Sequence, residues 1–165
     1  MTASDFISYW KNKTDHDDTP AVGIGVNWDK ISSDAQVSQY IGEEAWEMIG
    51  NFYPPLWGNF KRTQLKEWLD QTRSDYDKFI EEEKSVGKID LYKDNGLIYP
   101  DFCAIADESG IKGLLADGSH RYIDFNYLIN QDPKFKEEIK KSRLDVICVN
   151  NPNQVLNPID LTAIQ

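Results

Sequence analysis

The chain has 165 residues, and its 18 Lys and Arg against 28 Asp and Glu side chains give a formal net charge of −10 at pH 7. This length suits one domain, and a hydrophobic fraction of 40% argues against wholesale disorder, because it supplies enough apolar material for a core. So acidic a composition also argues against non-specific binding to duplex DNA, since Lys and Arg contacts to phosphates supply most of that affinity.

The first half of the chain is predicted to be mainly helical. Apolar residues at helical spacing predict three helices. The first covers residues 4–13 and the third covers residues 60–84. The second begins at a cap, which is Ser32, Ser33 or Asp34, and ends at residue 49. Pro54 and Pro55 break the second helix from the third, because proline does not fit a helix interior. The apolar run 21–28 indicates a strand that Gly23 and Gly25 weaken.

After Gly87 the pattern changes to short β-type runs. Strands are predicted at residues 97–99, 102–106, 111–116 and 144–149. The second and third of these form a hairpin through Ser109-Gly110. Helices are predicted at 119–130 and 133–142, and the stretch with Pro152 and Pro158 is predicted to be extended. The order of elements indicates an α+β fold, with a helical region 1–88 and a second region 89–165 in one compact unit.

Cysteine and histidine are scarce, which limits metal chemistry. Cys103 and Cys148 cannot form a disulfide framework or a four-ligand zinc site, and both are expected to be buried in apolar runs. The two histidines, His16 and His120, exclude a histidine-rich centre, so no resident metal site is predicted. The run Glu81-Glu82-Glu83 is expected to be a solvated helix face.

The stretch that points to chemistry is Asp117-Gly118-Ser119-His120-Arg121. It falls where an apolar strand ends and a helix begins, and a helix N-terminus attracts anions through its unpaired N–H groups. Gly118 allows a sharp turn, and Ser119 is a cap or a hydroxyl donor to phosphate. Two basic residues in a first helical turn oppose the helix dipole unless an anion or Asp117 compensates them.

A purely structural interpretation of the same five residues is the alternative. In it Asp117 and Gly118 form an ordinary turn and Ser119 caps the helix. Arg121 is then a surface residue that pairs with Asp117 or Asp124.

Residues 96–149 resemble the ParB/sulfiredoxin fold family. In that family a glycine-to-proline approach, here Gly96 to Pro100, leads into a strand, a turn and a second strand that ends in D-G-x-H-R. A helix and a further strand follow. The resemblance implies a helical N-terminal half packed on a small ParB/sulfiredoxin-like mixed sheet.

The resemblance also implies a nucleotide-phosphate-binding protein, because its members include CTP-hydrolysing partition proteins, ATP-using sulfiredoxins and a free-serine kinase. Carried over, Gly118, Ser119, His120 and Arg121 would contact phosphate, while Asp117 and His120 are the candidates for catalysis. Mg²⁺ with ATP, ADP or CTP would be the cofactor. Whether the chain is an enzyme, as a phosphotransferase or a nucleotide hydrolase, stays open.

The chain departs from the family in two ways. Ser119 stands where sulfiredoxins have their reactive cysteine, so repair of sulfinic acids is not expected. The basic DNA-binding domain of partition proteins has no counterpart, so direct binding to duplex DNA is not expected either.

The alternative function comes from charge alone. Residues 1–60 carry 3 basic and 9 acidic side chains, which suits a non-enzymatic acidic interaction protein that binds a basic partner surface. A phage-type inhibitor of a nucleic-acid-binding host protein is one example. The chain shows no secretory signal and no apolar run near the roughly 20 residues that span a bilayer, so we expect a cytoplasmic protein without membrane contacts.

Overall fold

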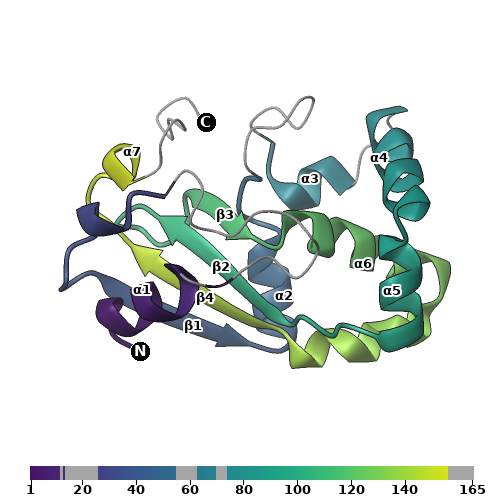
Figure 1. The fold of residues 1–165 in the computed structure, drawn as a ribbon, viewed down its shortest axis with the longest axis horizontal. Coiled ribbons are helices and arrows are strands. Elements are labelled where there is room, and N and C mark those ends of the chain that lie inside the picture. Colours follow the sequence, from purple (N-terminus) through teal and green to yellow (C-terminus); the bar gives the residue numbers. More distant parts are fainter. Residues whose placement is uncertain (12, 14–25, 55–62, 70–73, 156–165) are drawn as a thin grey trace.

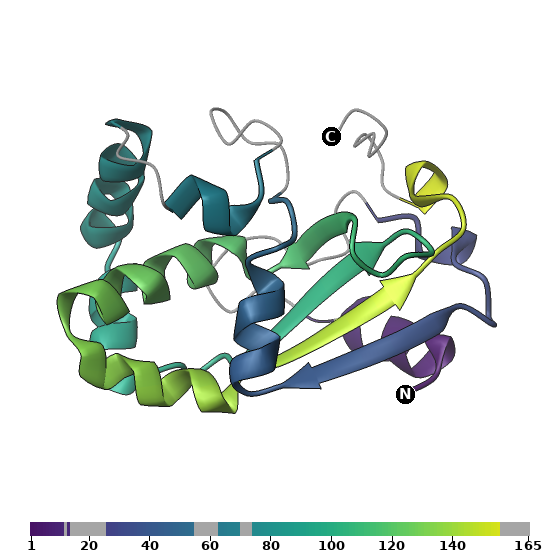
Figure 2. The same ribbon diagram turned by 180° about the vertical axis from the view of Figure 1, so that it is seen from behind.

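The structure is a computed structural model that describes residues 1–11, 13, 26–54, 63–69 and 74–155. These residues form one four-stranded sheet with helices on both faces (Figures 1 and 2). The strands are β1 (Gln36–Ile41), β2 (Asp101–Ala106), β3 (Gly113–Asp117) and β4 (Arg143–Cys148), and their order across the sheet is β1-β4-β2-β3. β4 runs parallel to β2, and the other two pairings are antiparallel, so the sheet is mixed and the fold is α+β.

The helices divide between the two faces of the sheet. In chain order they are α1 (Ala3–Lys11), η1 (Trp28–Lys30), α2 (Glu43–Ile49), α3 (Leu65–Leu69), α4 (Ser74–Ser85), α5 (Lys88–Asn95), α6 (Ser119–Gln131), η3 (Pro133–Lys141) and α7 (Pro152–Val155). α1 covers one face and α2 and α6 cover the other, with α4 and α5 beside α6 (Figure 1). Within the described residues, no helix has the length and apolar character needed to cross a membrane.

Side chains of β2 alternate between two hydrophobic clusters, because successive residues of a strand point to opposite faces. Phe102 and Ala104 pack with the residues of α2 and α6, whereas Cys103 and Ile105 pack with those of α1. The central strands β2 and β4 are therefore covered on both sides. β1 comes from the region 1–88 and pairs with β4 from the region 89–165, so the two regions share one sheet.

A polar cluster fastens α1 to its face of the sheet. Trp10 Nε1 donates to the buried Asp145 carboxylate at 3.0 Å, and the Tyr9 hydroxyl donates to Asp101. Lys13 Nζ lies 3.4 Å from Asp101 Oδ2 and Arg143 lies 3.7 Å from the same oxygen. Burial alone would raise the pKa of Asp101, but the Tyr9 hydroxyl and the cations of Arg143 and Lys13 outweigh it and lower the pKa.

The lowered pKa of Asp101 predicts a pH-dependent contribution to stability. A carboxyl whose pKa is lower in the folded state stabilises the fold above its unfolded pKa, and the contribution is lost as the pH falls through the folded value. Asp101→Asn should therefore lower the unfolding free energy at neutral pH, and the difference from wild type should shrink in acid. Urea unfolding across the acid range measures it. Glu137→Gln, which removes a surface pair with Lys140, is the control and should change little; an equal loss in both variants would contradict the prediction.

Most elements of the second region are confirmed. The helix predicted at 119–130 is α6, the hairpin strands are β2 and β3, and the final strand is β4. The prediction for 4–13 is confirmed as α1, and the segment predicted at 133–142 is the 3₁₀-helix η3. Each of these elements has a clear hydrophobic periodicity and a turn or cap residue at its boundary, and these two signals together allow an element to be predicted from sequence.

The predictions for residues 36–41 and 97–99 are wrong. Residues 36–41 form β1 rather than the start of a helix, and only Glu43–Ile49 is helical. Gly42, with φ of 71°, separates the two elements, and pairing with β4 fixes the strand. The predicted strand 97–99 is irregular, and its backbone bonds to side chains instead: Leu97 N donates to Glu138 Oε1, and the Tyr99 carbonyl accepts from Arg121.

Other predictions lie partly outside the described residues. Of the run 21–28 the structure describes only 26–28. Of the predicted helix 60–84 it describes residues 63–69 and 74–84, which lie in α3 and α4 except that residues 63 and 64 are not helical. His16 and Pro158 also lie outside. The prediction that the stretch with Pro152 is extended is wrong, because Pro152–Val155 forms the short helix α7, with proline at a first position that tolerates it. The helices η1 and α5 were not predicted.

Candidate functional site

Gly118 forms the turn that joins β3 to α6. Its φ of 108° is a conformation that residues with a Cβ rarely adopt. An added Cβ would also lie only 2.4 Å from Cδ1 of Phe102. The turn thus packs directly against the Phe102 ring. The space that a side chain at position 118 would occupy is filled by this ring and is not open to a ligand.

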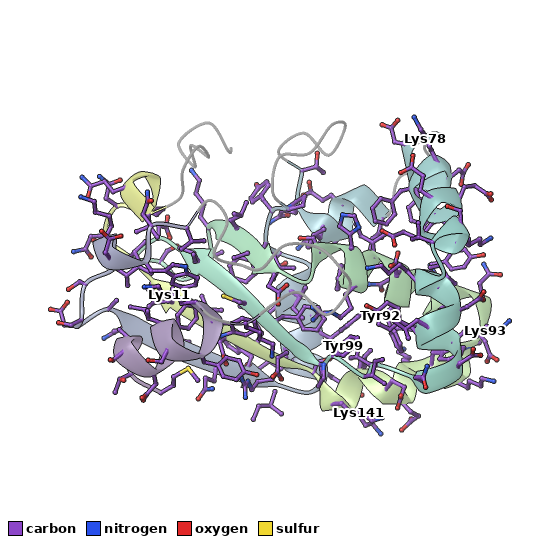
Figure 3. All side chains as sticks on the ribbon, viewed as in Figure 1. Lys11, Lys78, Tyr92, Lys93, Tyr99 and Lys141 are labelled. Atoms are coloured by element: carbon purple, nitrogen blue, oxygen red, sulfur yellow. The ribbon has the colours of Figure 1, made fainter. Side chains whose placement is uncertain are left out.

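Arg121 lies beneath the turn and is fully buried. Its Nη1 donates to the carbonyl oxygens of Tyr99 at 3.0 Å and of Asp101 at 2.7 Å. Its Nη2 lies 3.6 Å from Asp117 Oδ2, and its guanidinium lies 4.8 Å from the centre of the Phe102 ring. Figure 3 shows Tyr99 on the stretch that leads from α5 into β2. Arg121 therefore ties α6 to that stretch.

This placement corresponds to the structural interpretation of Arg121 more closely than to the phosphate-binding one. The ion pair with Asp117 that the structural interpretation predicted is present, although Arg121 is buried rather than on the surface. An enclosed guanidinium with two carbonyl acceptors is not presented to a ligand in solution. A phosphate contact by Arg121 accordingly stays a prediction that its position does not favour.

Asp117 also lies inside the fold. Its side chain is only 2% exposed and faces Arg121, so it orients the turn rather than presenting a carboxylate to solvent. A Mg²⁺ ligand or general base must reach its ion or substrate. The described residues contain no group of three side chains suited to hold a metal ion, and the buried Asp117 does not fit a magnesium ligand.

His120 is the exposed member of the turn, and α4 holds it in place. Its Nδ1 lies 2.5 Å from Oε1 of Glu83, and its ring centre lies 4.9 Å from that of Phe79. The Glu83 side chain is 7% exposed, against 36% for His120. Because a carboxylate only accepts hydrogen bonds, the neutral imidazole in this contact carries its proton on Nδ1. Glu83 thereby fixes the orientation of the ring.

Glu83 is the site residue that sequence reasoning missed, since the run 81–83 was expected to be solvated. A signal was present in the spacing. Glu83 follows Tyr76, Phe79 and Ile80 at intervals of seven, four and three residues, which places it on the apolar side of α4. An acidic residue on the apolar side of a helix needs a partner there.

Ser119 is the first residue of α6 and is 4% exposed. Its Oγ makes no hydrogen bond within the part of the chain that the structure describes. The preceding Gly118 offers no side-chain cap, and the first N–H groups of any helix lack an intrahelical acceptor. Among the described residues, the buried Ser119 hydroxyl therefore lies without a hydrogen-bond partner at the positive end of the 13-residue helix α6.

Two cavities of the fold lie elsewhere. One of about 390 Å³ opens at the carboxyl ends of β2 and β4, where Glu108, Cys148 and Asn150 contribute to its lining. The other, of about 530 Å³, lies between α4, α5 and α6, with Lys84 and Tyr127 among its lining residues. Neither is lined by residues 117–121, so a ligand at the turn would approach from the exposed side of His120.

The two cysteines do not contribute reactive thiols to the turn. Cys103 is fully buried as predicted, and burial and the nearby Asp117 raise the pKa of its thiol well above the usual value. Cys148 is partly exposed rather than buried, and burial followed by the charge of Asp107 raises its pKa as well. A raised thiol pKa lowers the fraction of reactive thiolate.

No protein-family model, no curated protein and no solved structure matches this chain. The function has to be inferred from the geometry of the chain's own residues.

Proposed function

We propose that this chain binds a nucleotide through a phosphate group at the N-terminus of α6, at a turn similar to that of the ParB/sulfiredoxin family. The observation that carries the proposal is the buried Ser119 hydroxyl, which has no hydrogen-bond partner among the described residues. A buried polar group without a hydrogen bond costs free energy. Because Ser119 is only 4% exposed, a phosphate oxygen becomes its acceptor once the first turn of α6 moves to admit it. The positive end of the helix favours the same charge.

The local charges indicate which groups carry the attraction. Arg121 faces Asp117 and His120 faces Glu83, so each basic side chain of the turn already has a carboxylate close by. The pull on a phosphate therefore comes mainly from the first N–H groups of α6 and from Ser119. Attraction of this kind, without an unpaired cation, supports moderate affinity rather than tight binding.

Arg121 and Glu83 support the site from behind. Arg121 holds the start of α6 against the stretch before β2, and Glu83 holds His120 at the exposed side of the turn. The only carboxylate within residues 117–121 is the buried Asp117. The proposal is accordingly one of binding, and phosphotransfer or nucleotide hydrolysis stays a prediction.

Calorimetry with ATP, ADP, CTP and inorganic phosphate, each with and without Mg²⁺, tests the proposal. We expect binding of at least one nucleotide, with weaker binding of inorganic phosphate because it lacks the base and sugar. Absence of heat from every nucleotide at millimolar concentration would overturn the proposal.

The variant Ser119→Ala should separate binding from folding. It should weaken nucleotide binding about tenfold or more, because a hydrogen bond to a charged group contributes about 1.5–3 kcal/mol. The unfolding free energy should stay the same or rise slightly, because the variant removes a buried hydroxyl that has no partner within the described residues. Calorimetric titration and urea unfolding measure the two effects.

Ser142→Ala is the matched control. Ser142 is buried too, and its Oγ likewise has no hydrogen-bond partner in the part of the chain that the structure describes, but it lies between η3 and β4. It should resemble Ser119→Ala in stability and wild type in affinity. Equal nucleotide affinity in all three proteins would show that Ser119 does not contact the ligand.

A further inference from the structure

The outer edge of β1 carries unpaired backbone groups. β1 is the first strand in the sheet order, and β4 is its one strand partner among the described residues. Both ribbon views show it along the lower margin of the sheet (Figures 1 and 2). Within the described residues, no backbone hydrogen bond joins residues 36–41 to any segment other than β4. Its outward N–H and C=O groups are therefore available to another strand.

β3, the opposite edge of the sheet, is covered instead. Tyr53 N donates to the Gly113 carbonyl at 3.1 Å, and Leu115 N donates to the Tyr53 carbonyl at 2.8 Å. The segment around Tyr53 thus runs alongside β3 and occupies part of its outer backbone. Among the residues that the structure describes, the outer edge of β3 is therefore partly covered and that of β1 is not.

β1 also lacks the features that normally prevent edge pairing. Natural edge strands are kept apart by charged side chains, prolines, bulges or short length. The sequence Gln-Val-Ser-Gln-Tyr-Ile of β1 has six residues without a charge, a proline or a glycine, in a chain of which 28% of the residues are charged. Ile41, at its end, is 70% exposed. Such an edge is suited to pair with another strand.

We propose that the occupant of this edge is β1 of a second copy of the chain, paired antiparallel about a two-fold axis to give one eight-stranded sheet. Antiparallel pairing is self-complementary for a strand without charge, since identical edges then meet without like charges opposite each other. The outward backbone groups of both copies become hydrogen-bonded, and no surface outside β1 is required.

The side chains select one register. Residues directly opposite each other in antiparallel strands lie on the same face, so the axis must pass midway between the two copies of one residue. With the axis at Gln39, Val37 lies opposite Ile41 of the second copy, and Ser38 lies opposite Tyr40. By symmetry, the exposed Ile41 of each copy then packs against Val37 of the other copy. With the axis at Ser38, Ile41 would instead face Ala35, which offers a smaller apolar surface.

The negative charge of the two copies opposes the association. Each copy carries −10, and salt screens repulsion between exposed charges farther apart than about 10 Å at moderate ionic strength. The dimer should therefore become tighter as salt is added. A partner held by attraction to the acidic surface would be released by the same change.

The test compares the mass in solution of wild type, Ile41→Lys and Ile111→Lys by light scattering and sedimentation. Ile111 is 66% exposed and lies in the turn between β2 and β3, so its variant is the matched control. Wild type and Ile111→Lys should approach twice 19.0 kDa as concentration rises, and more so in high salt. Ile41→Lys should remain at 19.0 kDa with an unchanged circular dichroism spectrum.

Three results would overturn the proposal. The first is a wild-type chain that stays monomeric at every concentration and salt level. The second is an Ile41→Lys variant that dimerises as wild type does, and the third is an equal loss of dimer in both lysine variants. Disulfide cross-linking of Gln39→Cys in a Cys148→Ser background tests the register, because only the axis at Gln39 brings two copies of that residue directly opposite each other.

Discussion

Replacing Arg121 with alanine should lower the unfolding free energy by about 3–5 kcal/mol, the usual cost of removing one partner of a buried ion pair. The variant leaves the Asp117 carboxylate, which is 2% exposed in its side chain, without its nearest cation. It also leaves the carbonyls of Tyr99 and Asp101 without the donor that now joins them to α6. Urea unfolding monitored by tryptophan fluorescence and by circular dichroism measures the loss.

Arg121→Lys is the informative companion to this variant. Lysine keeps the positive charge but cannot present a planar fork to two carbonyls and a carboxylate at once. Its stability should therefore lie between those of wild type and Arg121→Ala. From the sequence, loss of a cation at a helix N-terminus would leave stability unchanged or raise it. That result for Arg121→Ala would contradict the buried role described here.

Gly118→Ala should be the second strongly destabilising change, at about 2–5 kcal/mol from two separate effects. The first is backbone strain, because alanine must adopt a φ of 108°. The second is a steric clash, because the new Cβ meets the Phe102 ring, which also lies under the Arg121 guanidinium. Chemical denaturation provides the measurement, and loss of nucleotide binding should accompany the loss of stability.

Gly87→Ala separates the two effects. Gly87 has a φ of 82°, but nothing lies within 4 Å of an added Cβ. It should show the backbone strain alone, about 1–3 kcal/mol, and the excess at Gly118 reports the clash with Phe102. In a Phe102→Leu background that excess should shrink. Equal costs at the two glycines would mean that the turn can move away from the ring.

The sequence predicts well the parts of this fold that carry local signals. α6 is marked by its 3.6-residue periodicity after the Asp117-Gly118 turn, and the hairpin of β2 and β3 is marked by Ser109-Gly110. β1 has no such signal. Val37, Tyr40 and Ile41 fit a helical spacing, and only pairing with β4, more than one hundred residues later, makes the segment a strand. Long-range pairing is not visible in a local pattern.

The candidate site shows the same division. The motif locates the turn and the helix N-terminus correctly, since Gly118 and Ser119 stand where β3 ends and α6 begins. The direction of each side chain depends on tertiary neighbours instead. The Arg121 side chain points into the fold, where it contacts two backbone carbonyls and Asp117. His120 contacts Glu83 because α4 packs beside α6.

The central position of β4 has a consequence for how the chain assembles during synthesis. β4 is the last of the four strands to leave the ribosome, yet it separates β1 from β2 in the sheet. Synthesis adds about 5–20 residues per second, so β4 is made roughly 5–20 seconds after β1. Throughout that interval an uncharged six-residue segment has both backbone edges open. Chaperone dependence of the nascent chain should therefore be greatest before residue 148 is exposed, and it should fall sharply once β4 has joined the sheet.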